Sequence, residues 1–176
     1  MKKLLYPILA VLLLAGSAFT FITAQNWQIA DGYNIGFSND EAGGIFKDFK
    51  GSISFDENNP ATAKFDVTVD VASINTGNGL QNKHAKSDEW FDAAKYPTIH
   101  LVSTKVVKAG AAYQVTGNLQ IHGVTKPVTI PFTFKRGGAG GTFAGSFTIN
   151  RSDYGVGKPG GEVPEAVKLD ISVPVK

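Results

Sequence analysis

The chain of 176 residues contains no cysteine, and beyond its first residues it has no excess charge of either sign. The lack of cysteine excludes disulfides, thiol catalysis, thiolate metal sites and attachment of a lipid through cysteine. Lys2 and Lys3 supply the whole formal charge of +2, so acidic and basic side chains balance in the rest of the chain. Because a nucleic-acid-binding domain needs a basic excess to neutralise phosphates, this balance argues against that class of protein.

Motifs for common catalytic and cofactor chemistry are also scarce. His84, His100 and His122 are widely separated, and their spacing does not match a recognisable metal site. No Gly-x-Ser-x-Gly nucleophile motif occurs, and no helix-forming run follows the glycines at 137–141 to bind phosphate. We therefore expect no metal and no cofactor, although a Ser–His–Asp triad assembled only in three dimensions stays open.

The first 24 residues have the pattern of a secretory signal peptide. Two lysines precede a nearly unbroken aliphatic run at 4–15, and small residues follow. Cleavage after Ala24 is favoured over cleavage after Ala18, because a polar stretch begins at Gln25. The uncharged stretch is also long enough to span a bilayer, so an uncleaved anchor is the alternative. We expect an exported protein, periplasmic or secreted, with its working domain at 25–176.

Apolar and polar side chains alternate with a period of two along most of that domain, which predicts β-strands. The pattern is clearest where Phe65, Val67, Val69 and Val71 alternate with polar residues. Eight such segments predict an all-β fold, either an eight-stranded antiparallel barrel or a sandwich. The expected strands are 33–37, 49–55, 65–71, 99–107, 113–121, 128–134, 143–149 and 167–175.

Residues 73–97 interrupt the alternation. The segment 80–87 is compatible with two helical turns, and Asp88 is placed to N-cap a second short helix through Trp90 and Phe91. Long excursions between neighbouring strands are often functional. We interpret this one as a helical lid between the third and fourth strands, over one end of the barrel.

An eight-stranded barrel is just wide enough to be filled by its own side chains or to hold one small apolar ligand. Gly51, Gly117 and Gly145 on strand faces leave room inside, which favours a cavity over a filled core. An error of one residue in the choice of face would turn every assigned side chain outward. The candidates for the lumen are Val67, Val69, Ile99, Leu101, Val115, Leu119, Phe132, Phe147 and Ile149, with Trp90 and Phe91 at the gate.

Three blocks of sequence stand out from the strand pattern. They are Ser-Ile-Asn-Thr-Gly-Asn at 73–78, His-Gly-Val-Thr-Lys-Pro at 122–127 and Asn-Arg-Ser-Asp-Tyr-Gly at 150–155. Together with Trp-Phe-Asp-Ala at 90–93, and in the order in which they occur along the chain, these blocks resemble the YceI-like family of exported polyisoprenoid-binding proteins. The resemblance runs from Trp27 to the C-terminus. It implies a lipocalin-like, eight-stranded antiparallel barrel whose lumen takes the tail of a polyprenyl phosphate or an isoprenoid quinone.

The chain departs from the family pattern in two places. The segment 37–43 is short and lacks the histidine that the family usually carries there. The lid has Gln-Asn-Lys-His-Ala at 81–85 where the family usually has Arg-Asp-x-His-Leu, so only His84 is kept. In the lid a carboxylate has become Asn82 and a leucine has become Ala85, and because both changes touch the expected gate, they bear on which ligand the chain would take.

We expect a non-catalytic protein that carries, stores or sequesters a long apolar lipid, with no metal and no nucleic acid as partners. Burial of the tail would drive binding, and a few polar groups would orient the ligand. His84, His122 and Arg151 are candidates for contact with a polar or phosphorylated head group, and the alternative is that they make rim or turn hydrogen bonds. Two other functions stay open: an enzyme that uses His122 and Arg151 on a lipid, and a filled-core interaction module. A homodimer is also open.

Overall fold

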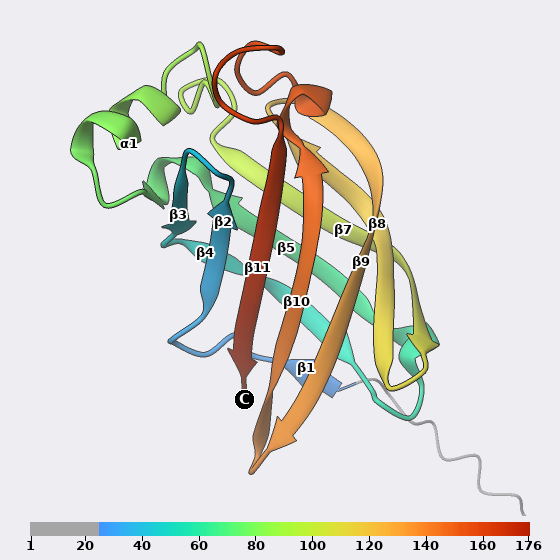
Figure 1. Ribbon diagram of the computed structural model, residues 1–176. Helices are drawn as coiled ribbons and strands as arrows, with labels where there is room; N and C mark the ends of the chain where they lie inside the picture. The colour runs from blue at the N-terminus through green and yellow to red at the C-terminus, as the bar shows by residue number, and fades with distance from the viewer. Residues whose placement is uncertain (1–24) are drawn as a thin grey trace, which may run out of the picture.

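The computed structural model describes residues 25–176, so the expected signal peptide lies outside the described residues. These residues form one antiparallel sheet that curls around an interior, together with one short α-helix (Figure 1). The eleven strands have the order β1-β4-β5-β7-β8-β9-β10-β11-β2-β3-β6. Among residues 25–176, no helix is both long enough and apolar enough to cross a membrane.

The strands differ greatly in length, from two residues to fourteen. Three short 3-10 helices, Pro60–Thr62, Val71–Ser73 and Arg151–Tyr154, interrupt them. The strands are β1 Gln25–Trp27, β2 Asn34–Ser38, β3 Gly43–Phe46, β4 Phe49–Phe55, β5 Lys64–Asp70, β6 Ile74–Asn75, β7 Thr98–Ala109, β8 Ala112–Ile121, β9 Val124–Gly137, β10 Gly140–Asn150 and β11 Ala166–Val175.

The all-β class and the antiparallel pairing are confirmed, but the expected number of eight strands is wrong. Each expected strand overlaps an observed one, and the three that were missed are β1, β3 and β6. These strands have only 3, 4 and 2 residues. Segments this short carry at most two periods of alternation, so the pattern could not distinguish them from turns.

The curl of the sheet brings its first segment against its last long strand. Just after β1, Ile29 forms a β-bridge with Val175 near the end of β11. Gln28 and Lys176 exchange two backbone hydrogen bonds, each 2.9 Å long. One face of every long strand therefore points into the interior, as in β8, where Val115 and Leu119 are buried while Gln114 and Asn118 are exposed.

Aromatic side chains fill one end of the interior. Phe55 is fully buried and lies at the centre of this group. Its ring centroid is 5.0 to 6.5 Å from those of five other aromatic residues, mostly in edge-to-face arrangements. Such arrangements add stabilisation beyond the buried area. We call this group the aromatic floor: Phe55, Phe65, Tyr113, Phe132, Phe134 and Phe143.

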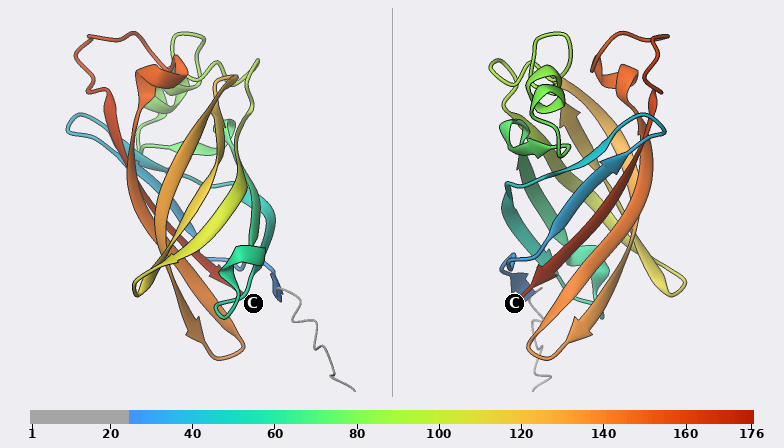
Figure 2. Two further views of the ribbon diagram at one scale, coloured as in Figure 1. Left: turned by 90° about the vertical axis from the view of Figure 1, so that its right-hand side faces the viewer. Right: turned by 60° about the vertical axis from the view of Figure 1, so that its left-hand side comes forward.

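The opposite end carries two excursions, which we call the lid segment (76–97) and the 155–165 loop. Figures 1 and 2 show both at the same end of the sheet, opposite the turn that joins β9 to β10. The helix α1, Gly79–Ala85, lies in the lid segment between β6 and β7. The Asn78 side chain caps this helix by accepting hydrogen bonds from the N–H groups of Leu80 and Gln81.

The first expected helix of the lid is confirmed, but the second helix, from Asp88 through Phe91, is wrong. Residues 87–95 instead form a series of turns. The Phe91 N–H donates back to the carbonyl of Ala85, and Asp92 has a positive φ of 42°. A residue in this left-handed region cannot continue a right-handed helix, so the chain turns there and returns to the sheet.

Candidate binding cavity

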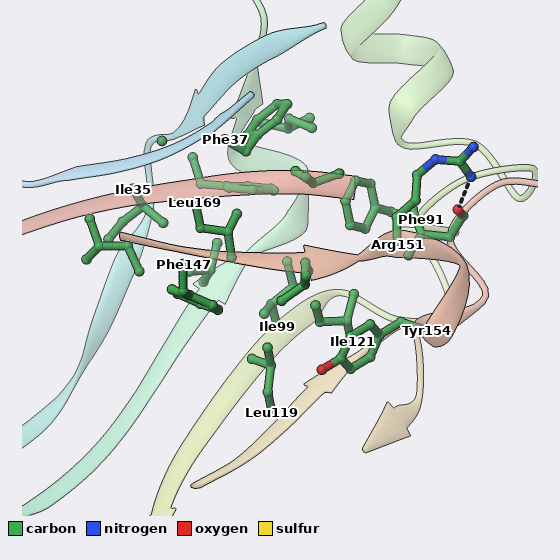
Figure 3. Close-up of a pocket in the computed structure, with 18 of the residues that line it drawn as sticks. Ile35, Phe37, Phe91, Ile99, Leu119, Ile121, Phe147, Arg151, Tyr154 and Leu169 are labelled. Carbon is green, nitrogen blue, oxygen red and sulfur yellow. Dashed lines mark hydrogen bonds between the residues drawn. The ribbon is translucent and has the colours of Figure 1, made fainter. Parts of the chain in front are cut away.

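A cavity of about 670 Å³ lies within the curled sheet (Figure 3). Side chains from strands far apart in the sheet order line it, including Ile35 on β2, Ile99 on β7 and Leu169 on β11. Its walls are mostly Ile, Leu, Val and Phe, and its volume falls in the range of about 300–1,000 Å³ typical of ligand pockets. At about 30 Å³ for each group the size of a water molecule, it has room for roughly twenty carbon-sized groups.

The aromatic floor closes the cavity at one end. Phe65, Phe132 and Phe143 line the space, whereas Phe55 and Phe134, which pack against them, do not. The same limit holds on β8, where Val115 lines the cavity and Tyr113, two residues nearer the floor on the same face, does not. The first three phenylalanines are therefore the deepest aromatic wall that a ligand could reach.

Three chain segments surround the other end of the cavity. The β2–β3 hairpin contributes Glu41, α1 contributes His84, and the 155–165 loop contributes Glu162 and Val163. This is the end at which the sequence predicts a lid. The lid segment does contribute to the lining, through both α1 and the turns that follow it.

The structure places all eleven side chains assigned to lumen and gate at the cavity wall. Their contact with a lipid stays a prediction. The lining also includes residues of β2 and β11 that were not selected from the sequence, although their alternation carried the same signal. The eleven are Val67, Val69, Trp90, Phe91, Ile99, Leu101, Val115, Leu119, Phe132, Phe147 and Ile149, and the additions include Ile35, Phe37, Leu169 and Ile171.

Trp90 joins the two excursions at the mouth. Its indole N–H donates a hydrogen bond of 2.7 Å to Nε2 of His84. On the other side, the Arg151 guanidinium lies 5.1 Å from the Trp90 ring centre. Gly157, with φ of 67°, approaches so closely that a Cβ there would lie 3.1 Å from the indole. The lid segment and the 155–165 loop thus meet at this one side chain.

Arg151 is buried, and its guanidinium has no free donor for a ligand. Its Nε donates to the carbonyl of Pro164, Nη1 to those of Val156 and Lys158, and Nη2 to those of Lys158 and Val163. These contacts occupy all five N–H groups of the side chain. Arg151 lines the cavity, but its donors hold the 155–165 loop in shape rather than facing a head group.

His122 does not line the cavity, so the structure does not bring it together with His84 and Arg151. It occupies the two-residue turn between β8 and β9, where His122 and Gly123 both have positive φ, 51° and 77°. This is the combination that a tight hairpin of this kind requires. Its ring packs on Tyr96 with centroids 4.6 Å apart. The turn interpretation therefore describes His122 better than the head-group interpretation.

Tyr154 is a cavity residue that sequence reasoning did not select. It ends the 3-10 helix that follows β10, and only 3 % of its surface is exposed. Burial, and then the nearby Asp153 carboxylate, raise the pKa of its hydroxyl above the ordinary value of 10.0. Figure 3 shows the side chain directed toward Leu119 and Ile121, with the hydroxyl at its tip. The block at 150–155 pointed to this segment, but not to the direction of this side chain.

The electrostatics of the mouth depend on few groups. Glu41 and Glu162 are the carboxylates of the lining, and within residues 25–176 the lining includes no lysine.

Glu165 lies behind the loop, where the Ser152 hydroxyl, the Gly160 N–H and the Asn150 amide donate to its carboxylate and lower its pKa. Across the described range 25–176, no three His, Asp or Glu side chains are grouped so that they could hold a metal ion.

A curled antiparallel sheet around an apolar cavity is an architecture that can hold one small apolar ligand. The sequence matches the YceI-like domain over residues 22–175, and the chain belongs to that family. It is 39% identical over 140 residues to a UPF0312 protein of Enterobacter sp. (strain 638), covering 74% of this chain and 71% of that one. It is 40% identical over 136 residues to a UPF0312 protein of Pseudomonas savastanoi pv. phaseolicola, covering 73% and 70%.

Solved structures show the same fold. The crystal structure of Burkholderia cenocepacia BcnA matches with a TM-score of 0.77 and 32% identity, covering 82% of this chain and 96% of that one. The Campylobacter jejuni YCEI protein matches with a TM-score of 0.70 and 28% identity, covering 78% and 85%. A polyisoprenoid binding domain from Saccharophagus degradans matches with a TM-score of 0.62, covering 88% and 95%; at 15% identity this likeness concerns the fold alone.

Proposed function

We propose that this chain is a non-catalytic binding protein that holds one long apolar lipid, of the isoprenoid type, inside the cavity. One observation carries the proposal: an apolar space of about 670 Å³ that is closed at one end and bordered by a lid at the other. The structural neighbour described as a polyisoprenoid binding domain supports an isoprenoid as the class of ligand. The pattern of the first 24 residues supports a role outside the cytoplasm, in transport, storage or sequestration.

Burial of the tail would supply the affinity. Transfer of a methylene group out of water contributes about 0.8 kcal/mol, so enclosing roughly twenty carbons gives a gross gain of about 16 kcal/mol. Association and ordering offset about 4–15 kcal/mol of that gain. Tight binding therefore does not require a strong interaction with the head group.

The charged groups that line the cavity favour an uncharged head group over a phosphate. Glu41 and Glu162 would repel an anion, and every guanidinium donor of Arg151 is already engaged. Nε2 of His84 accepts the Trp90 hydrogen bond, so the neutral ring keeps one donor, the N–H of Nδ1. Because one neutral donor offsets little of the cost of burying a phosphate, a prenyl alcohol or an isoprenoid quinone is the better candidate than a polyprenyl phosphate.

The test is extraction of the full chain, expressed with its own first 24 residues and purified without detergent. Organic extraction followed by mass spectrometry should release one apolar lipid with an uncharged head group, chemically unaltered. Leu119→Arg, at the cavity wall, should be purified without that lipid. Val102→Arg, on the outer face of the neighbouring strand with 37% of its surface exposed, is the matched control and should retain it.

Three outcomes would contradict parts of this proposal. A chain that carries no lipid, with a cavity that takes up none when lipid is offered, would leave the interaction module as the better explanation. Recovery of a phosphate-bearing lipid would contradict the head-group assignment alone. A ligand returned in chemically altered form would favour the enzymatic alternative.

A further inference from the structure

The hydroxyl of Tyr154 is a polar group at the cavity wall that makes no hydrogen bond to another residue of 25–176. Within that range no fully enclosed polar side-chain atom lacks a partner. The hydroxyl is therefore not sealed in the protein, and it keeps access to the space that the residue lines. Its immediate surroundings are apolar: Tyr154 packs in a buried cluster with Leu119, Ile121 and Val156.

A phenylalanine would fill this position equally well if packing were the only requirement. An apolar ligand that filled the cavity would displace the water that this hydroxyl can bind, which is unfavourable unless the ligand offers an acceptor. The chain uses phenylalanine at twelve positions, several of them in the same cavity wall, so the hydroxyl at Tyr154 calls for a partner that the protein itself does not supply.

Tyr154 is also held firmly in place. Its 3-10 helix is capped by the Asn150 side chain, which accepts a hydrogen bond from the Ser152 N–H. Gly155, with φ of 69°, ends that helix, and Arg151 in the same turn binds the 155–165 loop. The raised pKa of the hydroxyl keeps it protonated near neutral pH. The side chain is thus a rigid, neutral donor that lies just below the lid.

We infer that Tyr154 donates a hydrogen bond to an acceptor oxygen, of the carbonyl type, on an uncharged ligand within the cavity. The inference rests on the proposed function and refines it: the polar atom of the ligand lies beside Leu119 and Ile121, inside the mouth, and not in the solvent beyond the lid. A donor at this depth selects for oxygen-bearing lipids without contributing to the binding of a pure hydrocarbon.

The experiment compares two probes of the same length: a methyl ketone with an isoprenoid tail of roughly twenty carbons, and the corresponding hydrocarbon. Both are titrated into the full chain and into Tyr154→Phe. The variant should bind the ketone about three- to tenfold more weakly, the usual effect of one net hydrogen bond. Its affinity for the hydrocarbon should be unchanged or higher. Tyr113→Phe, also buried but outside the cavity lining, should alter neither affinity.

Infrared spectroscopy gives a second measurement that does not depend on affinity. The carbonyl stretching band of the bound ketone should lie at lower frequency in the native protein than in Tyr154→Phe. If both probes bind and Tyr154→Phe changes neither the ketone affinity nor the band, the inference is overturned and the proposed function stands. If neither probe binds the native protein, the inference about Tyr154 and the proposed function fail together.

Discussion

The indole N–H of Trp90 lies 2.7 Å from Nε2 of His84, so the lid helix is tied to the turn that follows it. Trp90 also packs against Arg151 and Gly157 of the facing segment. One side chain thus links the two excursions that border the mouth. Phe91, the next residue, packs edge-to-face on Phe46 of β3 with centroids 6.1 Å apart, which anchors the same turn to the sheet.

Trp90→Phe should speed the release of a bound lipid while changing global stability little. The variant keeps an aromatic ring but loses the donor to His84, and a net hydrogen bond at such a site is worth about 0.5–1.5 kcal/mol. Stopped-flow displacement should show a faster dissociation rate, and hydrogen exchange should increase within 79–93. Lys86→Ala, a neighbouring change that leaves this bond intact, is the control. An unchanged dissociation rate in Trp90→Phe would mean that the lid does not control exit.

Phe132→Leu should allow the cavity to take a longer tail. Phe132 belongs to the aromatic floor and lines the deepest part of the space, so a smaller side chain there lets the ligand reach further. A series of prenyl alcohols of increasing length should show affinity rising and then levelling off, with the plateau at a longer tail in the variant. We expect a stability loss of about 1–2 kcal/mol.

Phe147→Leu is the matched control for that experiment. Phe147 also lines the cavity but lies further along β10, beyond the floor residue Phe143. Its truncation should widen the space without deepening it, so the length at the plateau should not change. If both variants shift the plateau equally, the aromatic floor does not set the length of the tail.

The long strands and their inward faces could be predicted from the sequence because a half-buried strand leaves its record in every second residue. Val67 on β5 and Leu119 on β8 were assigned to the interior on that ground alone, and both line the cavity. The same rule failed for β6, because two residues cannot display a period. The helix rules failed in part of the lid, where Asp88 does not begin a second helix and residues 87–95 form turns instead.

The roles of the polar residues were much less visible in the sequence. For Arg151 the sequence left open a head-group contact or rim hydrogen bonds, and its acceptors are backbone carbonyls, which every residue possesses and no motif marks. For His122 the same two alternatives were open, and the structure places it in the β8–β9 turn with a positive φ. Tyr154 was overlooked because only the three-dimensional structure shows where its hydroxyl points.

Acidification should loosen the 155–165 loop through Glu165. Its pKa lies below the ordinary 4.5 because the Ser152 hydroxyl, the Gly160 N–H and the Asn150 amide favour the charged form. The stabilising contribution is therefore complete above about pH 4.5 and is lost as the pH falls through the lower, folded-state value. Hydrogen exchange of the loop should increase across that interval. Glu165→Gln should show fast exchange of the loop at all pH values, without an increase on acidification. If this variant keeps an acid-dependent increase of native size, a group other than Glu165 causes that increase.

Arg151→Lys should destabilise the protein strongly even though the charge is kept. A lysine has three donors on a single atom and cannot reach the carbonyls of Val156, Val163 and Pro164 together, so buried acceptors lose their partners. We expect a loss of about 3 kcal/mol in the free energy of unfolding, measured by chemical denaturation. Arg136→Lys is the matched control, because Arg136 pairs with Glu57 at the surface and its replacement should cost less than about 1 kcal/mol. Equal effects of the two substitutions would show that the carbonyl contacts of Arg151 contribute no more than a surface ion pair.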